Sequence, residues 1–438
     1  QIMVWFVLLG GLAVIGLTRL PIGMGLGLTG LVVLKFIVGD AESLAVSAVW
    51  DVLSDFTLAA IPLFIFMGEI LLVSGVSARI YNALTPFFRD FPGGLLHSNI
   101  AVCTVFGAVS GASTSTAAAI GSVAYPELSQ RGYDKPLLVA TLAAGGTLGL
   151  LIPPSLSLLL YGVTQGVSIG RLFLAGVVPG LVLALMFMVL ISMLSKRKTK
   201  NKTLNSQAES QNITLTSKLV GLIQIWPVAF IAFAVLGTLY MGLATPTEAA
   251  ALGVVASIFT GIAWGGLRLA NLWQAFVTSV RAFGSIAVVL IGALILSQSL
   301  AILGLPQQLA VAMVDAGLGK YQVLLAVIVL YLVLGCFFDG ISLLLMTVPI
   351  MYPVLMAAGF DPVWTGVVIT ILIEIGMITP PVGMNLFVLT ALTNGEVPLG
   401  RAAMAAIPFW LTMLVGIALF AWIPDIVLWL PNLVMGAK

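Results

Sequence analysis

Apolar stretches of about twenty residues recur from one end of this 438-residue chain to the other. Each is long enough to cross a hydrocarbon layer of about 30 Å as an α-helix. Charged residues make up 8% of the chain, whereas soluble domains carry about 25%. The mean hydropathy of +1.18 excludes a single anchor joined to a soluble domain. We therefore predict an all-α polytopic membrane protein, because a membrane β-barrel would show short segments of alternating polarity.

The few reactive side chains argue against an enzyme. Cys103 and Cys336 each lie in an apolar run, and we interpret them as core residues without a disulfide. His97 is the single histidine, so a zinc-type cluster is not expected. No GxxxxGK[ST] stretch and no Ser-His-Asp arrangement is visible, so we expect an ion gradient to supply the energy. The N-terminal run lacks a basic n-region and is expected to be a span, not a signal peptide.

A polar stretch divides the chain into two similar halves. Residues 196–218 are basic and rich in Ser, Asn and Gln, which is typical of a solvated linker. YPELSQRGYDKP, from Tyr125, is matched by YPVLMAAGFDPV, from Tyr352, at an offset of 227 positions. The same offset relates Gly132 to Gly359, Asp134 to Asp361, Pro153 to Pro380 and Pro154 to Pro381. We predict an internal duplication, with repeats at 1–195 and 219–438 joined by a cytoplasmic linker.

Each half shows the same order of elements. The first half has predicted spans near 2–18, 21–38, 57–75, 136–163 and 170–194, with an amphipathic segment near 41–56. The second half has predicted spans near 219–240, 246–265, 284–304, 362–393 and 402–430, with an amphipathic segment near 268–282. The two remaining segments are interrupted by Gly and polar residues, and we predict that they are re-entrant hairpins. We name them hairpin one (93–124) and hairpin two (321–358); one kinked span in each place is the alternative.

The distribution of Lys and Arg bears on this topology. Five spans and one hairpin per half give the two repeats opposite orientations. With the linker in the cytoplasm by the positive-inside rule, fourteen of the eighteen Lys and Arg residues fall on that side. Only Lys35, Arg171, Lys320 and Lys438 do not. We therefore predict inverted repeats with both termini outside, hairpin one on the cytoplasmic face and hairpin two on the opposite face.

A Pro-Pro pair interrupts one apolar span in each half, in GGTLGLLIPPSLS (145–157) and EIGMITPPVGMN (374–385). Proline removes a backbone donor and clashes with the preceding turn, so the helix opens there. Freed carbonyls at membrane depth are tolerated only where they are buried in protein or line a cavity. Inverted repeats with broken helices are the architecture of a secondary transporter.

Small, oxygen-bearing residues accompany these breaks. Carbonyl and hydroxyl oxygens suit Na⁺, and glycine lets the backbone approach closely. The candidate Na⁺ ligands are Gly111, Ser113, Ser115, Gly149, Pro153, Pro154 and Ser155 in the first half, and Asp339, Gly340, Ser342, Thr379, Pro380 and Pro381 in the second. The alternative is that the small residues only permit tight contact between helices.

Asp339 is the most informative of these residues. A carboxylate inside a hydrophobic segment is costly and marks a functional site by default. No Lys or Arg occurs within 321–358, so a bound cation would serve as its partner. Glu69 and Glu374 are weaker candidates, because either can pair structurally. Asn385 either binds substrate or caps a helix.

Five motifs together resemble the large membrane subunit, DctM type, of tripartite ATP-independent periplasmic (TRAP) transporters. They are IPLFIFMGEIL (61–71), GAVSGASTSTAAAIG (107–121), GGTLGLLIPPS (145–155), TPTEAAALG (245–253) and GMITPPVGMNLFV (376–388). The resemblance covers nearly the whole chain and is greatest to the sialic-acid permeases of the family. It places the family's hairpin serines at Ser113 and Ser115, its hairpin-two acid at Asp339, and its breaks at Pro153–Pro154 and 379–381.

The resemblance implies an elevator-type, secondary active transporter in the bacterial inner membrane, driven by two or more Na⁺ and with both termini periplasmic. It implies uptake of an organic acid, expected to be sialic acid (N-acetylneuraminate), with a C4-dicarboxylate or another organic acid as the alternative. The expected partners are a separate small membrane subunit (Q type) and a periplasmic binding protein (P type), with no nucleic acid. We expect a scaffold at about 1–56 and 219–283 and a transport domain at about 57–194 and 284–430. A stand-alone Na⁺/dicarboxylate carrier and a channel remain the other interpretations.

Overall fold

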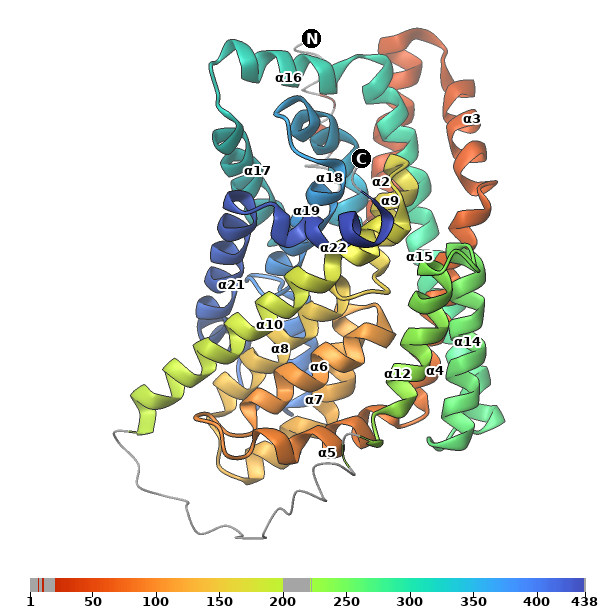
Figure 1. The fold of residues 1–438 in the computed structure, drawn as a ribbon. Helices are drawn as coiled ribbons and strands as arrows, with labels where there is room; N and C mark the ends of the chain where they lie inside the picture. Colours follow the sequence, from red (N-terminus) through yellow and green to blue (C-terminus); the bar gives the residue numbers. More distant parts are fainter. Residues whose placement is uncertain (1–6, 8–9, 12–19, 200–220, 222, 437–438) are drawn as a thin grey trace.

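The structure is a computed structural model that describes residues 7, 10–11, 20–199, 221 and 223–436. Every regular element in these residues is a helix, and Figure 1 shows many of them running roughly side by side. Eight of the described helical segments are long and apolar enough to cross a membrane. The prediction of an all-α polytopic membrane protein is therefore confirmed for this part of the chain. Most of the predicted span 2–18, and residues 200–218 of the predicted linker, lie outside the described residues.

The first half contains α2 (Ile22–Val32), η1 (Val33–Gly39), α3 (Glu42–Leu53), η2 (Phe56–Ala59), α4 (Ala60–Val73), α5 (Val76–Phe88), α6 (Leu96–Ser110), α7 (Ser113–Gln130), α8 (Lys135–Leu151), α9 (Leu156–Gln165) and α10 (Ile169–Thr199). The second half contains α12 (Trp226–Ala232), η3 (Phe233–Gly237), α13 (Thr238–Tyr240), α14 (Pro246–Ala263), α15 (Leu269–Ile302), α16 (Leu305–Asp315), α17 (Lys320–Gly335), α18 (Gly340–Ala357), α19 (Pro362–Met377), α20 (Met384–Leu392), α21 (Leu399–Trp422) and α22 (Asp425–Met435). Two of these helices, α5 and α16, were not expected from the sequence.

The helices that end at a Pro-Pro pair, α8 and α19, start in the same way. Each begins after an Asp, Asp134 or Asp361, whose carboxylate accepts the backbone N–H three residues later, at 3.1 and 3.0 Å. Such a cap satisfies a donor that the first helical turn leaves free. The glycine two positions before each Asp has a positive φ, 80° at Gly132 and 82° at Gly359, which glycine adopts at low cost. Residues matched by the duplication therefore have matching local structure.

Each predicted hairpin is a pair of helices joined by a tight turn. Both α6 and α7 contact α8, and both α17 and α18 contact α19. The two arms of each pair also contact each other, so each segment is two packed helices and not one continuous helix. Every residue from 137 to 162, in α8, most of α9 and the residues between them, is buried.

Two predicted boundaries are wrong. Residues 269–302 form one helix, α15, of 34 residues instead of an amphipathic segment (268–282) followed by a span (284–304). It contains no proline, and each of its two glycines destabilises a helix by only about 1 kcal/mol, so nothing divides it. The predicted span 402–430 is instead broken between α21 and α22 at Pro424, which lacks a backbone donor. Arg171 of α10 holds α22 in place by donating to Asn432 Oδ1 at 2.6 Å.

Candidate functional site

Hairpin one turns at Gly111 and Ala112 and touches the interruption between α8 and α9, which we call the first break (153–155). Gly111 has a φ of 66°, and a Cβ at this position would lie 2.7 Å from the carbonyl oxygen of Pro154. The N–H of Leu156 donates to the carbonyl oxygen of Gly111 at an N···O distance of 3.3 Å. Because Gly111 has no side chain, the tip of hairpin one can contact the first break.

The first break is sealed inside the protein. Pro153 and Pro154, joined by a cis peptide bond, are both buried, and Ser155 is 1% exposed. The hydroxyl of Ser155 donates to the carbonyl oxygen of Leu150 and accepts the N–H of Leu158 at 3.2 Å, which starts α9. One serine thus satisfies a free acceptor of α8 and a free donor of α9.

Part of the small-residue run serves close contact between helices. A Cβ at Gly149 would lie 2.7 Å from Thr116 Oγ1 and 3.0 Å from the carbonyl oxygen of Ala112. The Thr116 hydroxyl donates to that same carbonyl at 2.7 Å and hydrogen-bonds to Ser110. The Thr116 hydroxyl is therefore satisfied within the hairpin, and Gly149 lets α8 approach it closely. Ser115, by contrast, is half-buried.

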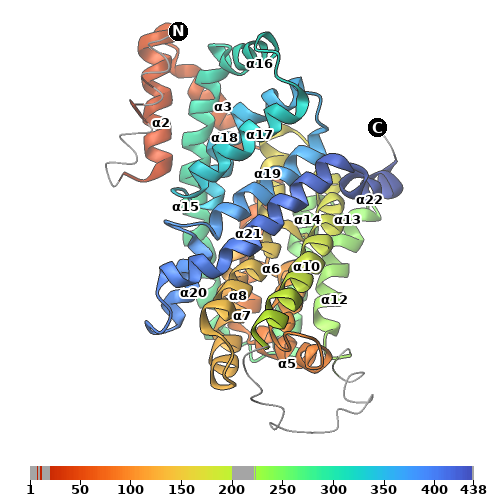
Figure 2. The same ribbon diagram turned by 90° about the vertical axis from the view of Figure 1, so that its left-hand side faces the viewer.

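Ser113 connects the two halves of the chain. It is 2% exposed, and its Oγ accepts the side-chain amide of Asn385, which is 0% exposed, at 2.6 Å. The same amide nitrogen donates to the carbonyl oxygen of Ala143 at 3.2 Å. Figure 2 shows α20, which carries Asn385, beside α7 and α8. Asn385 therefore does not face an open cavity in this conformation, although the sequence made it a candidate for substrate binding.

Hairpin two turns at residues 336–339 and meets the interruption between α19 and α20, the second break (379–383). Asp339 precedes α18, and its carboxylate accepts the N–H of Ser342 at 3.1 Å. A Cβ at Gly340 would lie 2.9 Å from a side chain of α19, so the tip lies tightly against that helix. The N–H of Val382 donates to the carbonyl oxygen of Cys336 at 3.2 Å. The tip and the break are therefore linked as they are in the first half.

The second break is open where the first is closed. Pro380 and Pro381, also joined by a cis peptide bond, are exposed. Thr379 is half-buried, and its hydroxyl donates to the carbonyl oxygen of Ile375 at 2.6 Å. Gly383 has a φ of 49° and starts α20. Residues 380 and 381 of this break are therefore not covered by the rest of the described chain.

A cavity of about 460 Å³ lies between hairpin two and the α2–α15 pair. Its polar side chains are those of Asp339, Ser342 and Ser285, and its other walls are residues 21–24 of α2 and apolar residues of α15 and α18. Ser285 was missed by sequence reasoning, because one serine within a long apolar helix has no distinguishing pattern. The half-buried carboxylate of Asp339 thus faces an accessible space.

Glu374 is a sealed carboxyl group with no partner among the described residues. It is 0% exposed, lies in α19, and neither carboxyl oxygen has a hydrogen bond. An ionised carboxylate in such a place is very costly. Glu69, the other weaker candidate, is half-buried in α4.

A polar cluster that the sequence did not reveal joins the halves outside the apolar region. Glu396, in the loop after α20, accepts the hydroxyl of Tyr125 at 2.7 Å and lies 3.1 Å from Lys135 Nζ. The Tyr125 hydrogen bond, and then Lys135, lower the pKa of Glu396 below its ordinary value. Tyr125 belongs to the repeated motif, but nothing along the chain indicates its partner 271 positions away.

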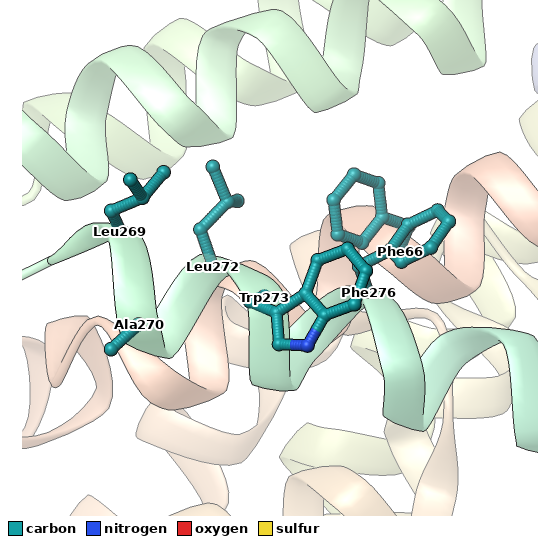
Figure 3. A pocket seen from close by; sticks show the side chains of 6 residues that line it. All are labelled: Phe66, Leu269, Ala270, Leu272, Trp273 and Phe276. Carbon is teal, nitrogen blue, oxygen red and sulfur yellow. The ribbon is translucent and has the colours of Figure 1, made fainter.

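The described residues contain no group of three or more His, Cys, Asp and Glu that could hold a metal ion. The possible ion ligands at the two breaks are hydroxyl, amide and carbonyl oxygens and one carboxylate. A further pocket of about 720 Å³ on the outer face of α4 and α15 is lined by Phe66, Leu269, Ala270, Leu272, Trp273 and Phe276 (Figure 3). Its lining is aromatic and aliphatic, and the indole nitrogen of Trp273 is the one polar side-chain atom among the six residues.

Known proteins are similar in sequence to this chain over nearly its full length. The family described as "Tripartite ATP-independent periplasmic transporter, DctM component" matches residues 9–426. The C4-dicarboxylate TRAP transporter large permease protein DctM of Pseudomonas aeruginosa is 33% identical, over 93% of each chain. The isethionate TRAP transporter permease protein DctMQ of Oleidesulfovibrio alaskensis is 31% identical, over 96% of this chain and 65% of its own length. The sialic acid TRAP transporter large permease protein SiaM of Vibrio cholerae is 29% identical, over 95% and 96%.

The fold is also similar to solved transporters. The YdaH transporter of Alcanivorax borkumensis superimposes with a TM-score of 0.62 at 14% identity, over 88% of this chain and 89% of that one. At this identity the likeness concerns the fold alone. It agrees with a helical membrane architecture.

Proposed function

This chain belongs to the DctM family of tripartite ATP-independent periplasmic transporters, and we propose that it is a large permease subunit that uses a Na⁺ gradient to import an organic anion. The observation that carries the ion coupling is the pairing of a hairpin tip with a broken helix in each half. One backbone hydrogen bond joins each pair, Leu156 to Gly111 and Val382 to Cys336. Broken helices and their free carbonyls are where secondary transporters coordinate Na⁺.

The proposed Na⁺ ligands are those expected from the sequence, and the structure supports them in two groups. Gly111, Ser113, Ser115, Gly149 and residues 153–155 surround the first break. Asp339, Gly340, Ser342 and residues 379–381 surround the second. Two places of this kind suit at least two ions. The carboxylate of Asp339 supplies charge at the second place, whereas the first offers only neutral oxygens.

The proposed mechanism is an elevator, in which a mobile domain carries the site past a static frame. The cavity beside Asp339 lies along the contact of hairpin two with α2 and α15, which is where two such bodies would slide. A helix moves as a unit, so the boundary expected at 283/284 cannot lie inside α15. We place all of α15 in the frame together with α2, α3, α14 and α4, because α4 contacts α14 and α15. Hairpins one and two with both broken helices form the mobile domain.

Crosslinking tests this division. In a background without Cys103 and Cys336, Met24→Cys with Ile341→Cys joins the two walls of the cavity, and its crosslink is expected to stop uptake. Asn99→Cys with Thr141→Cys joins α6 to α8, whose side chains there are 3.0 Å apart, and its crosslink should leave uptake intact. The reverse pattern would show that the static and mobile parts are exchanged.

The organic anion is proposed only by class. The relatives are named for C4-dicarboxylate, isethionate and sialic acid, and sialic acid, the expectation from the sequence, is one of these three. A small Q-type subunit and a periplasmic binding protein are the proposed partners, since the isethionate relative is named DctMQ. We propose the bacterial inner membrane, with α5 and the α7–α8 turn, at the lower end of Figure 1, in the cytoplasm and both termini periplasmic.

Uptake into proteoliposomes tests the function. Liposomes with the chain and its small subunit are given an inward Na⁺ gradient, each candidate binding protein, and sialic acid, C4-dicarboxylates or isethionate. We expect saturable uptake of one acid that needs both Na⁺ and a binding protein. Equal uptake without any binding protein would support a stand-alone carrier. Flux that neither saturates nor needs Na⁺ would support a channel.

A further inference from the structure

The side chain of Asn385 belongs to the second half but donates its hydrogen bonds to residues of the first. It is the second residue of α20 and is 0% exposed. Its Nδ2 donates to Ser113 Oγ at 2.6 Å and to the carbonyl oxygen of Ala143 at 3.2 Å. These partners are 272 and 242 positions away along the chain. An amide from α20 therefore reaches the start of α7 and the middle of α8.

The orientation of this amide follows from its neighbours. The carbonyl oxygen of Ala143 only accepts hydrogen bonds, so the NH₂ group of Asn385, and not its oxygen, must face it. Oδ1 of Asn385 is consequently turned away. It is buried and has no hydrogen-bond partner among the described residues. A buried acceptor of this kind normally has a partner, such as a donor, a water or an ion.

Glycines keep the tip of hairpin one close to α8 and to the first break. A Cβ at Gly146 would lie 3.2 Å from the carbonyl oxygen of Ser113, so glycine keeps α7 and α8 in close approach. Gly111 likewise lies against the carbonyl oxygen of Pro154. The unpartnered amide oxygen thus belongs to a side chain held against the start of α7, where Ser113 carries a hydroxyl oxygen and a carbonyl oxygen. Only neutral oxygens meet there, a set that suits a monovalent cation.

We propose that Oδ1 of Asn385 is a Na⁺ ligand that the second half supplies to the site at hairpin one. The inference rests on the proposed Na⁺ coupling and adds a residue from the other repeat to it. An ion held jointly by Asn385 and Ser113 ties α20 to α7. Occupancy of the first site therefore fixes the broken helix of the second half, and the two sites are coupled through one side chain.

Two substitutions of Asn385 distinguish a residue that binds Na⁺ from one that only holds α7 and α8 in place through hydrogen bonds. Asn385→Leu removes the amide donors and the oxygen. Asn385→Asp removes the donors but keeps an oxygen in the position of Oδ1 and adds a negative charge. If Oδ1 binds Na⁺, the Asp variant keeps or strengthens Na⁺ binding and the Leu variant loses it. If the amide only braces Ser113 and Ala143, the two variants weaken Na⁺ binding equally.

Asn99 offers a matched control. It is also 0% exposed, its Nδ2 donates to Thr141 Oγ1 at 3.0 Å, and its Oδ1 also has no partner among the described residues. It lies near the start of α6, at the end of hairpin one away from the tip. Asn99→Leu is therefore expected to lower stability without changing the response to Na⁺.

The readout is the melting temperature of the purified protein as Na⁺ replaces choline, because a ligand that binds the folded state raises it. For Asn385→Leu we expect the Na⁺ concentration at half-maximal stabilisation to rise by about tenfold or more, the effect of losing one good contact. Asn385→Asp should show a midpoint at or below that of the wild type. If Asn385→Leu does not fold, Asn385→Ser, whose hydroxyl is too short to reach the same place, replaces it.

The outcomes are distinct. Equal midpoints for the Leu (or Ser) and Asp variants, or a wild-type midpoint for the Leu (or Ser) variant, would overturn the role of Asn385. A wild-type protein that Na⁺ does not stabilise would overturn the proposed Na⁺ coupling itself. A Leu variant with a raised midpoint, beside an unchanged Asn99→Leu variant and a retained Asp variant, supports the proposal.

Discussion

The two breaks are the same sequence device in two different environments. Each is a Pro-Pro pair that ends a buried helix and receives a hairpin tip, yet Pro153 and Pro154 are buried whereas Pro380 and Pro381 are exposed. At the first tip Ser113 is 2% exposed and bonded to Asn385. At the second, Asp339 faces a cavity. One site is closed by protein and the other communicates with its surroundings.

Because of this difference, the oxygen atoms at the two breaks have different possible partners. Oxygens of the closed site must be satisfied by protein groups or by an enclosed ion, whereas those of the open site can exchange with solvent. If the open and the sealed regions differ in function as they do in structure, substitutions in the two regions should have unequal effects.

The largest expected effect is at the open carboxylate. Asp339→Asn removes the charge facing the cavity, and we expect Na⁺-driven uptake to fall roughly 10- to 100-fold, as for a lost charged contact of about 1.5–3 kcal/mol. Uptake of labelled substrate is measured at several Na⁺ concentrations, with membrane insertion checked on the same samples. Wild-type uptake with an unchanged Na⁺ response would remove Asp339 from the site.

The next effect is at the closed tip. Gly111→Ala is expected to destabilise the protein by about 1–2 kcal/mol from its left-handed backbone, and further because the new Cβ meets the Pro154 carbonyl at 2.7 Å. Gly132→Ala is the control, since Gly132 has a similar φ of 80° but nothing within 4 Å of its Cβ position. Melting temperatures in detergent compare the two. Equal losses would mean that the tip does not press on the first break.

The hydroxyls of the closed tip come third. Ser113→Ala with Ser115→Ala should raise the Na⁺ concentration for half-maximal uptake roughly 3- to 10-fold, the equivalent of about one neutral contact. The paired control is Ser122→Ala, a hydroxyl on the same helix that bonds to the carbonyl oxygen of Ala119. Normal Na⁺ activation in the double variant would leave tight helix contact as the whole explanation of the small-residue run.

The smallest effect is at the sealed carboxyl. Glu374 has no donor among the described residues and should remain uncharged, so Glu374→Gln, of equal size and without charge, should change uptake by no more than about twofold. The same carboxyl-to-amide change is thus expected to have a large effect at Asp339 and a small one at Glu374. A large loss at Glu374 would show that this group ionises during transport.

Much of the architecture follows from local rules. Length and hydrophobicity identify membrane helices because the hydrocarbon layer has a fixed thickness, and Pro153 and Pro380 mark breaks because proline cannot continue a helix wherever it lies. The duplicated motif likewise predicted the matching starts of α8 and α19. The continuity of α15 was missed, because an amphipathic stretch and an apolar one can share a single helix.

What the sequence alone determined about this protein is its membrane class, its duplication, its family resemblance and the positions of its hairpins and breaks. Only the tertiary structure decided that one break is closed and the other open, that Asn385 reaches Ser113 272 positions away, and that Asp339 faces a cavity bounded by α2 and α15. The physical reason is that these properties depend on how distant helices pack together. The composition of a helix predicts that the helix is buried. Which other helices it packs against depends on the tertiary structure.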